Sequence, residues 1–251
     1  MSLGLEEKMS RPVCAIVGAG EGLGRSLGAK FASQGFDIAL ISRSEASCIA
    51  AIEAVQTANN TVEVRFYSAD ATNPETLESA LSDAARELGE IEVLIYNVRK
   101  DFTACAPLDM SYAELEDIYQ VEVIGAFAAA KSVLPSMINR SRGSLFFSSA
   151  TAALRGSGTY PLYSIGKFGL RALSQSLTRA YAKDGVHIVH FRLDCDLDVP
   201  IMRDLYGVRY DPEKLARPDD VAETYWLTYL QPTGAWSNEV EIRPSNEVWT
   251  C

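Results

Sequence analysis

The sequence predicts an α/β fold in which helices cover both faces of a parallel sheet, and two observations support it. From residue 12 onward, short runs rich in β-branched residues alternate with longer helical patterns. The chain has 251 residues, 47% of them apolar, so it can bury one sizeable core. No linker, repeat or low-complexity tract interrupts the alternation. We therefore expect a single domain over residues 1–251, with a flexible tail at 1–10.

The alternation also places the individual elements. About seven strands are expected, including those at residues 13–17, 37–41, 62–68, 93–96, 144–147 and 187–193. Helices are expected at residues 23–34, 44–58, 74–88, 112–137 and 163–182. Strands joined by helices in this way run parallel, which predicts a doubly wound sheet. Ligands of such sheets bind beyond the carboxyl ends of the strands, so the loops after the strands are the candidate functional segments.

Charge and hydropathy exclude two classes of partner. The chain has 23 basic and 33 acidic residues, and its net charge of −10 repels nucleic acid and acidic membranes. The longest apolar candidate, near residues 123–130, ends at Lys131 and is interpreted as a buried helix, not a membrane span. The first ten residues lack the apolar core of a secretory signal. We therefore expect a cytoplasmic protein with no nucleic-acid or membrane partner.

The cysteines and histidines do not indicate a metal site or a disulfide framework. The five cysteines are odd in number and never spaced C-x-x-C: Cys14, Cys48, Cys105, Cys195 and Cys251. His187 and His190 lie three apart in an expected strand, where their side chains point to opposite faces. They cannot converge on one ion, so no metal is expected.

A glycine-rich loop lies between the first expected strand and the first expected helix. Gly18 permits a tight turn, Gly22 lets backbone amides approach a pyrophosphate, and Gly24 allows close helix packing. In this strand, loop and helix context the pattern indicates a dinucleotide-binding, Rossmann-type sheet. The expected contacts in the loop are Gly18, Gly20, Glu21, Gly22, Leu23 and Gly24.

The loop after the second strand bears on the choice of cofactor. Ser42 and Arg43 stand where an NAD enzyme is expected to carry an acid for the ribose 2′-hydroxyl. Arg43 can instead pair with a 2′-phosphate, and Ser42 can donate to it, so NADP is favoured. Glu21 opposes this choice mildly, and Arg43 is alternatively a solvated surface residue. NAD therefore stays possible.

Three residues farther along the chain have the chemistry of carbonyl reduction. Tyr163 and Lys167 are four residues apart in an expected helix, which places both on one face. A nearby cation favours tyrosinate and lowers the phenol pKa from about 10, so that the phenol can exchange a proton near neutral pH. Upstream, an expected strand ends at Ser148 and Ser149, for which strand-end capping is the structural alternative.

Together, the G-x-x-x-G-x-G loop, the serine-bearing strand and the Y-x-x-x-K helix resemble the classical short-chain dehydrogenase/reductase family, over roughly residues 12–230. The resemblance implies hydride transfer between NAD(P) and a carbonyl or secondary alcohol. It implies that Tyr163 is the general acid/base, that Ser149 binds the substrate carbonyl, and that Lys167 tunes the tyrosine and binds the nicotinamide ribose. Ser148 stays open as the active hydroxyl. A non-catalytic dinucleotide-binding protein is the alternative function.

The resemblance implies further contacts and partners. Asp70 and Ala71 match the segment that contacts adenine, although a helix N-cap at Thr72 or Asn73 explains the same residues. Asn97 is implied as a cofactor contact. A small carbonyl or alcohol substrate is implied, as is a homo-oligomer, dimer or tetramer, formed through the helices at 112–137 and 163–182.

The chain departs from the family pattern near the expected active site. Arg99 replaces a glycine after the fourth strand, Asp194-Cys195 replaces a Pro-Gly turn, and residues 240–244 lack the usual D-G-G. Glu122 replaces an asparagine that takes part in a proton relay. Either Glu122 lies close to Lys167, or it turns away and pairs with a surface cation. Residues 200–217 are expected to form the substrate lid, whose apolar side chains suit an apolar substrate or pack an ordinary surface helix.

Overall fold

The computed structural model describes residues 11–100 and 103–246, so the expected tail at 1–10 and Cys251 lie outside the described residues. Its centre is a seven-stranded sheet in the order β3-β2-β1-β4-β5-β6-β7, with every neighbouring pair parallel. The strands are β1 (Val13–Val17), β2 (Asp37–Ser42), β3 (Val64–Ser68), β4 (Ile91–Tyr96), β5 (Gly143–Ala150), β6 (Val186–Leu193) and β7 (Glu239–Ile242). The predicted doubly wound α/β fold is confirmed.

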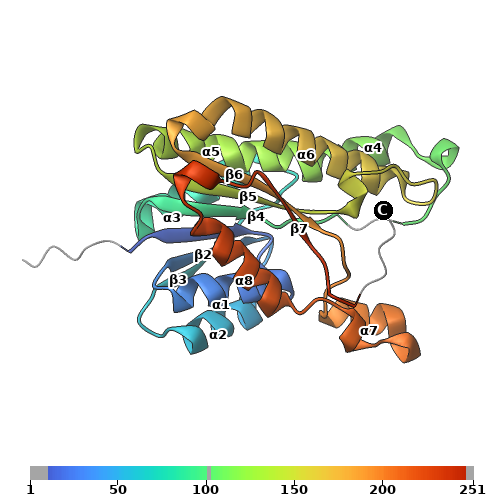
Figure 1. The fold of residues 1–251 in the computed structure, drawn as a ribbon, viewed down its shortest axis with the longest axis horizontal. Helices are drawn as coiled ribbons and strands as arrows, with labels where there is room; N and C mark the ends of the chain where they lie inside the picture. Colours follow the sequence, from blue (N-terminus) through green and yellow to red (C-terminus); the bar gives the residue numbers. More distant parts are fainter. Residues whose placement is uncertain (1–10, 101–102, 247–251) are drawn as a thin grey trace, which may run out of the picture.

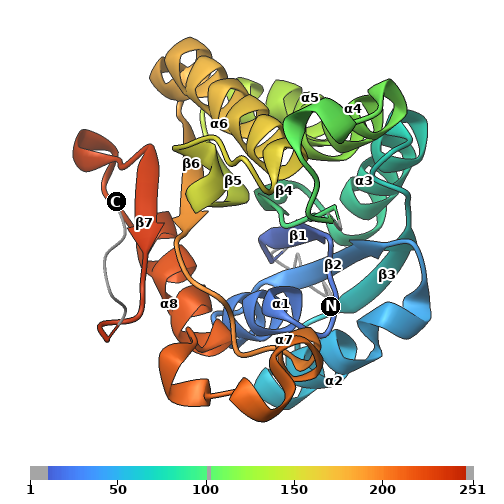
Figure 2. The same cartoon turned by 90° about the vertical axis from the view of Figure 1, so that its right-hand side faces the viewer.

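Helices cover both faces of the sheet (Figure 1). One layer contains α3 (Pro74–Leu88), α5 (Gly125–Asn139) and α6 (Pro161–Tyr181), and its core holds Leu77, Ala129 and Leu170. The other contains α1 (Leu23–Ser33), α2 (Ile49–Ala58) and α8 (Pro218–Tyr229), and its core holds Phe31, Val55 and Tyr225. Figure 2 looks onto the edge where the strands end, near which α7 (Pro200–Tyr206) lies. β4 is buried along its whole length, and apart from Glu92, which pairs with Arg140 and Arg142, its residues are Ile, Val, Leu and Tyr, as in a central parallel strand.

The starts of several helices are set by capping side chains and prolines, which hydrophobic periodicity alone does not show. The predicted helix 74–88 is confirmed, and it begins where the Asn73 side chain accepts hydrogen bonds from the amides of Glu75 and Thr76, ahead of Pro74. The cap is therefore Asn73 and not Thr72. The predicted helix 44–58 is instead a 3₁₀ turn (Glu45–Cys48) followed by α2. The seventh strand is β7, which the sequence did not place.

The predicted helix 112–137 is two helices joined by a wider turn. The helix α4 (Tyr112–Tyr119) leads into a π-helical turn (Gln120–Ile124) and then α5. Among the described residues this 28-residue run is the one helix long and apolar enough to cross a membrane, but 56% of its apolar window is buried inside the protein. It packs on the sheet, so it is a core helix, as the sequence predicted.

The π turn fits against β4. The hydroxyl of Tyr96 donates a hydrogen bond to the carbonyl of Val121, within the turn. Gly125, the first residue of α5, lies so close that a Cβ there would be 2.6 Å from the Tyr96 hydroxyl oxygen and would also meet the Ala71 carbonyl. A π turn costs regular hydrogen bonding, and such turns are frequent at functional sites.

We therefore expect Gly125→Ala to lower the free energy of unfolding by about 1 to 3 kcal/mol, because the added methyl overpacks a rigid contact. Urea denaturation measures this loss. The control is Gly156→Ala, at an exposed position where a Cβ meets nothing within 4 Å, and it should change stability by no more than about 0.5 kcal/mol. Equal stability of the two variants would contradict the close packing of the turn.

Candidate active site

The site lies where the order of strand addition reverses, between β1 and β4. From β1 the chain adds β2 and β3 on one side and then crosses to add β4 on the other. The loops after β1 and β4 therefore diverge around a crevice at the carboxyl ends of the strands. Asn97, directly after β4, spans both loops: its backbone amide donates to the Val17 carbonyl (2.8 Å) and its side chain to the Gly18 carbonyl (3.2 Å). This expected cofactor residue thus also holds the glycine loop in place.

The glycine loop forms a cradle that side chains would fill. Gly18 has a φ of +84°, and a Cβ there would lie 2.7 Å from the Asn97 carbonyl oxygen. A Cβ at Gly24 would lie 2.9 Å from the Ala19 Cα. The helix α1 begins after Gly22 with no side-chain cap, so its first amides stay available for an anion. These features fit a pyrophosphate.

A cavity of about 350 Å³ opens beside this loop. Of the expected cofactor residues it is lined by Gly18, Gly20, Ser42, Arg43, Asp70, Ala71 and Asn97. The other expected cofactor residues, which are Glu21, Gly22, Leu23, Gly24, Tyr163 and Lys167, are not among its lining residues. The Leu23 side chain is instead buried in the core beneath α1. Eight further lining residues were not expected from the sequence as site residues, and they are Val17, Ala19, Ile41, Ser47, Ala69, Val98, Lys100 and Val121. They adjoin predicted site residues in the chain or in space, but no motif marks them.

The adenosine end of the cavity combines one cation with one anion. Arg43 is exposed and forms no ion pair with any described residue. Asp70 accepts hydrogen bonds from the Thr72 amide (2.9 Å) and hydroxyl (2.8 Å), which lower the pKa of its carboxyl, and the charge of Arg43 lowers it further. A charged carboxylate and a guanidinium therefore face the same cavity.

The two candidate serines point to opposite faces of β5. Ser148 shares a hydrogen bond with the buried hydroxyl of Tyr225, on α8 (2.9 Å). Ser149 lies on the α6 side, is 4% exposed, and its hydroxyl has no hydrogen-bond partner among the described residues. Buried polar groups are normally paired, so an unpaired hydroxyl calls for a ligand. Ser149 therefore fits the active hydroxyl better than Ser148.

Lys167 is buried beside both Tyr163 and Glu122. Its Nζ lies 2.8 Å from Glu122 Oε2 and 5.7 Å from the centroid of the Tyr163 ring. The side chains of Lys167 and Glu122 are 3% and 0% exposed. The structure thus selects the first of the two alternatives for Glu122, in which it contacts Lys167. Because Lys167 and Tyr163 share one helical face, the i,i+4 spacing does bring the expected pair together.

Burial raises the pKa of Tyr163 above its ordinary value, and the charge of Glu122 adds to this rise. The charges of Lys167 and Arg99 lower it, but the net direction is upward. The nearby cation by itself was expected to lower the phenol pKa, whereas a Glu122 carboxylate close to Lys167 was expected to raise it, and the second direction is the one that the structure indicates. Burial lowers the pKa of Lys167, but the charges of Glu122 and Tyr163, together with the hydrogen bond to Glu122, raise it by more than burial lowers it. The net direction is upward, so the ammonium stays charged.

Two other departures from the family pattern interact with each other. Asp194, after β6, accepts hydrogen bonds from the hydroxyl of Thr151 and the guanidinium of Arg243, which follows β7. The Asp194 and Arg243 side chains are 7% and 6% exposed, so this is a buried ion pair. It connects the carboxyl ends of β5, β6 and β7 beside the expected nicotinamide site. The two altered turns therefore compensate each other, a pairing that sequence spacing does not reveal.

The expected lid has its own anchors. The hydroxyls of Tyr206 and Tyr210 donate to Asp196 and Asp198, which fixes the two ends of the segment around α7. Ile201 and Leu205 are 52% and 68% exposed, so they do not pack a core. Both therefore remain available to a ligand at the open edge of the sheet.

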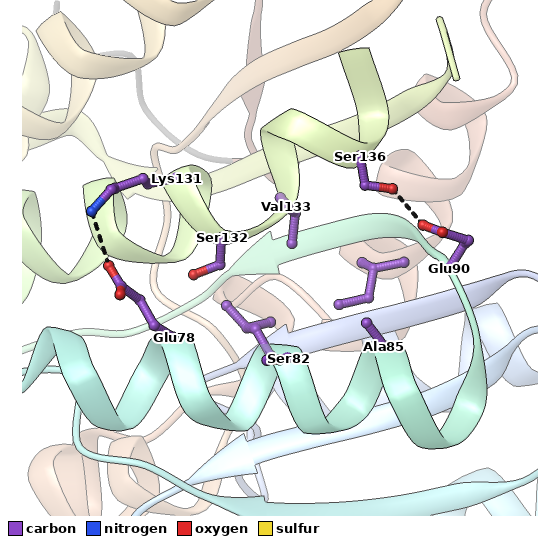
Figure 3. Close-up of a pocket in the computed structure, with 10 residues that line it drawn as sticks. Glu78, Ser82, Ala85, Glu90, Lys131, Ser132, Val133 and Ser136 are labelled. Carbon is purple, nitrogen blue, oxygen red and sulfur yellow. Dashed lines mark hydrogen bonds and ion pairs between the residues drawn. The ribbon is translucent and has the colours of Figure 1, made fainter. Parts of the chain in front are cut away.

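A second cavity, of about 360 Å³, lies between α3 and α5 (Figure 3). Lys131 and Glu78 bridge one end, and Ser136 donates to Glu90 at the other. None of the predicted site residues lines it. It is separate from the dinucleotide crevice.

Comparison with known proteins shows the family to which the chain belongs. The short chain dehydrogenase family model matches residues 12–193, and the chain belongs to that family. An uncharacterized oxidoreductase of Staphylococcus saprophyticus is 26% identical over 92% of this chain and 97% of its own length. A short-chain dehydrogenase structure from Rhodopseudomonas palustris is 27% identical, with a TM-score of 0.79 over 93% of this chain and 98% of that one. A metagenomic short-chain oxidoreductase solved with NADP has a TM-score of 0.80 at 19% identity, over 93% and 97% of the two chains.

Proposed function

We propose that this oxidoreductase transfers a hydride between NADP(H) and a carbonyl or secondary alcohol, with Tyr163 as the general acid/base. The observation that carries the proposal is the buried, unpaired hydroxyl of Ser149, on the same side of the sheet as Tyr163 and Lys167. It lies at the end of β5, next to the strand whose loop lines the dinucleotide cavity. A substrate carbonyl oxygen there would satisfy it.

The residues present fit the cofactor. Gly18, Gly20 and the open start of α1 would hold the pyrophosphate, and Ser42 with Arg43 would hold a 2′-phosphate. When bound, the nicotinamide supplies the hydride that reduces the carbonyl carbon. Ser149 donates a hydrogen bond to the carbonyl oxygen, and Tyr163 gives that oxygen its proton. The positive charge of Lys167 stabilises the phenolate that Tyr163 becomes when it gives up its proton. The same steps in reverse oxidise a secondary alcohol.

The two serines allow a direct test. Ser149→Ala should lower kcat/KM for carbonyl reduction by at least about 10²-fold and leave stability unchanged, because its hydroxyl has no bond to lose. Ser148→Ala should keep activity but cost about 1 to 3 kcal/mol, because the buried Tyr225 hydroxyl loses its partner. A panel of ketones and aldehydes with NADPH, and urea denaturation, measure the two effects.

Tyr163→Phe is the companion variant, and it should lose at least about 10²-fold in turnover while it still binds NADPH. The alternative function, a non-catalytic dinucleotide-binding protein, predicts NADPH binding by fluorescence but no reduction of any carbonyl by the unchanged protein. Full activity of Tyr163→Phe would show that the tyrosine is structural.

The cofactor preference rests on Arg43. Because Arg43 forms no ion pair with a described residue, a 2′-phosphate would meet an uncommitted guanidinium. Arg43→Asp should weaken NADPH binding by about 1.5 to 3 kcal/mol and turn the preference toward NADH. Nicotinamide fluorescence titrations with both cofactors measure this, and an unchanged preference would disprove the role of Arg43.

We also propose that the protein is a cytoplasmic homo-oligomer that pairs through the α4, α5 and α6 layer. This layer exposes apolar side chains at Tyr119 (42%), Ile124 (40%), Phe127 (50%) and Phe168 (41%). Exposed apolar side chains on one layer of helices are typical of a protein interface.

Light scattering should therefore give a mass at least twice 27.4 kDa. Phe127→Asp should shift it toward the monomer, because it places a charge within the interface. Leu227→Asp is the matched control, on the opposite face of the sheet and 57% exposed, and it should leave the mass unchanged. A monomeric unchanged protein would refute the assembly.

A further inference from the structure

We propose that Glu122 is a positioning residue that binds Lys167 directly, and that the resulting buried ion pair adapts the active site to carbonyl reduction with Tyr163 as proton donor. The inference rests on the proposed function. It assigns a role to a residue that departs from the pattern the chain otherwise resembles.

The first support is geometric. Glu122 lies in the π-helical turn, whose wider winding places its side chain against α6. A Cβ at Gly166 would lie 2.9 Å from Glu122 Cγ, so a larger residue there would collide with the carboxylate arm. The small residue one position before Lys167 thus makes room for the pair. A glycine in a helix interior is intrinsically unfavourable, which indicates that this space has a use.

The second support is that both carboxylate oxygens are occupied. Oε2 accepts from Lys167 Nζ at 2.8 Å, and Oε1 accepts from the backbone amide of Lys100 at 3.3 Å. Lys100 lies on the loop after β4 and lines the dinucleotide cavity. Glu122 therefore ties the catalytic lysine to the wall of the cofactor crevice. Lys167 Nζ also approaches the Ser148 carbonyl, at 3.5 Å, which leaves one ammonium hydrogen for a further partner.

The third support is the charge balance around the phenol. The charged and titratable groups that act on Tyr163 are Lys167, Glu122, Arg99 and Asp196. Burial is the largest cause of the raised pKa of Tyr163, and the charges of Glu122 and Asp196 add to it by opposing those of Lys167 and Arg99. Glu122 also acts on the buried Tyr96, whose pKa is raised by burial first and by this charge second. The phenol of Tyr163 thus keeps its proton through the neutral range.

A protonated phenol is the form that carbonyl reduction consumes, whereas alcohol oxidation needs tyrosinate. The raised pKa means that the proton donor persists as the pH rises and is lost only at alkaline pH. The rate of carbonyl reduction should therefore be maintained into the alkaline pH range. Alcohol oxidation should become appreciable only at a higher pH than an unperturbed tyrosine would give.

Spectroscopic titration tests this without any substrate. Tyrosinate absorbance of the unchanged protein minus that of Tyr163→Phe reports on Tyr163 alone. We expect this difference to show no ionisation below about pH 10, the ordinary tyrosine value. Ionisation clearly below that value would overturn the inference. Because no turnover is required, a protein that reduces no carbonyl would defeat the proposed function and still yield this result.

Two substitutions separate charge from shape. Glu122→Gln keeps the size and hydrogen-bonding oxygen but removes the charge, so Tyr163 should ionise about half a unit to one unit lower. The alkaline limb of the pH profile of kcat/KM should move by the same amount. Glu122→Asp keeps the charge and should retain the original limb even if kcat falls.

A merely structural Glu122 would lower kcat in both variants and leave the limb in place, which would contradict the proposal. Removing one member of a buried pair can also unfold the protein. If Glu122→Gln does not fold, the titration of the unchanged protein against Tyr163→Phe still overturns the proposal when Tyr163 ionises clearly below about pH 10.

Discussion

Parallel pairing of β1 with β4 is the constraint on which the rest of the site depends. It places the loop after Val17 beside the loop after Tyr96, and the two backbones then hold each other through Asn97. Gly18 must be a glycine because the Asn97 carbonyl occupies the space of a side chain. The same arrangement directs the start of α1 and the open end of β4 toward one crevice. The glycine loop and the candidate active site thus both depend on the contact between these two strands.

Buried charge follows the same logic of mutual dependence. Burying Lys167 or Glu122 alone would cost desolvation free energy, and the same holds for Asp194 and Arg243. In each pair the attraction between the opposite charges offsets this cost. Both pairs lie at the carboxyl edge of the sheet, one on the α6 side and one across β5 to β7. Glu122, Asp194 and Arg243, which depart from the family pattern, are therefore each part of a buried ion pair at this edge of the sheet.

Much of the fold could be predicted because it depends on local chemistry. The β-branched runs defined β1 and β2 almost to the residue, and Pro74 marked the start of α3. The π turn at Gln120–Ile124 could not be predicted, since helical periodicity continues across it and its contact with the hydroxyl of Tyr96 joins segments far apart in the chain. The cavity-lining positions Ser47 and Lys100 were missed for a similar reason, because only the folded loops bring them to the crevice.

By itself the sequence determined the class of sheet, the glycine loop and the pairing of Tyr163 with Lys167, because each depends on residues a few positions apart. It left open which serine is active and where Glu122 points. Tertiary structure decided where Glu122 points and which serine hydroxyl lacks a hydrogen-bond partner among the described residues. Ser148 and Ser149 are neighbours in the chain but face different helix layers, one bonded to Tyr225 and the other unpaired. Glu122 reaches Lys167 only because the π turn and Gly166 let two distant helices approach. Contacts between distant segments are set by packing, which no local pattern encodes.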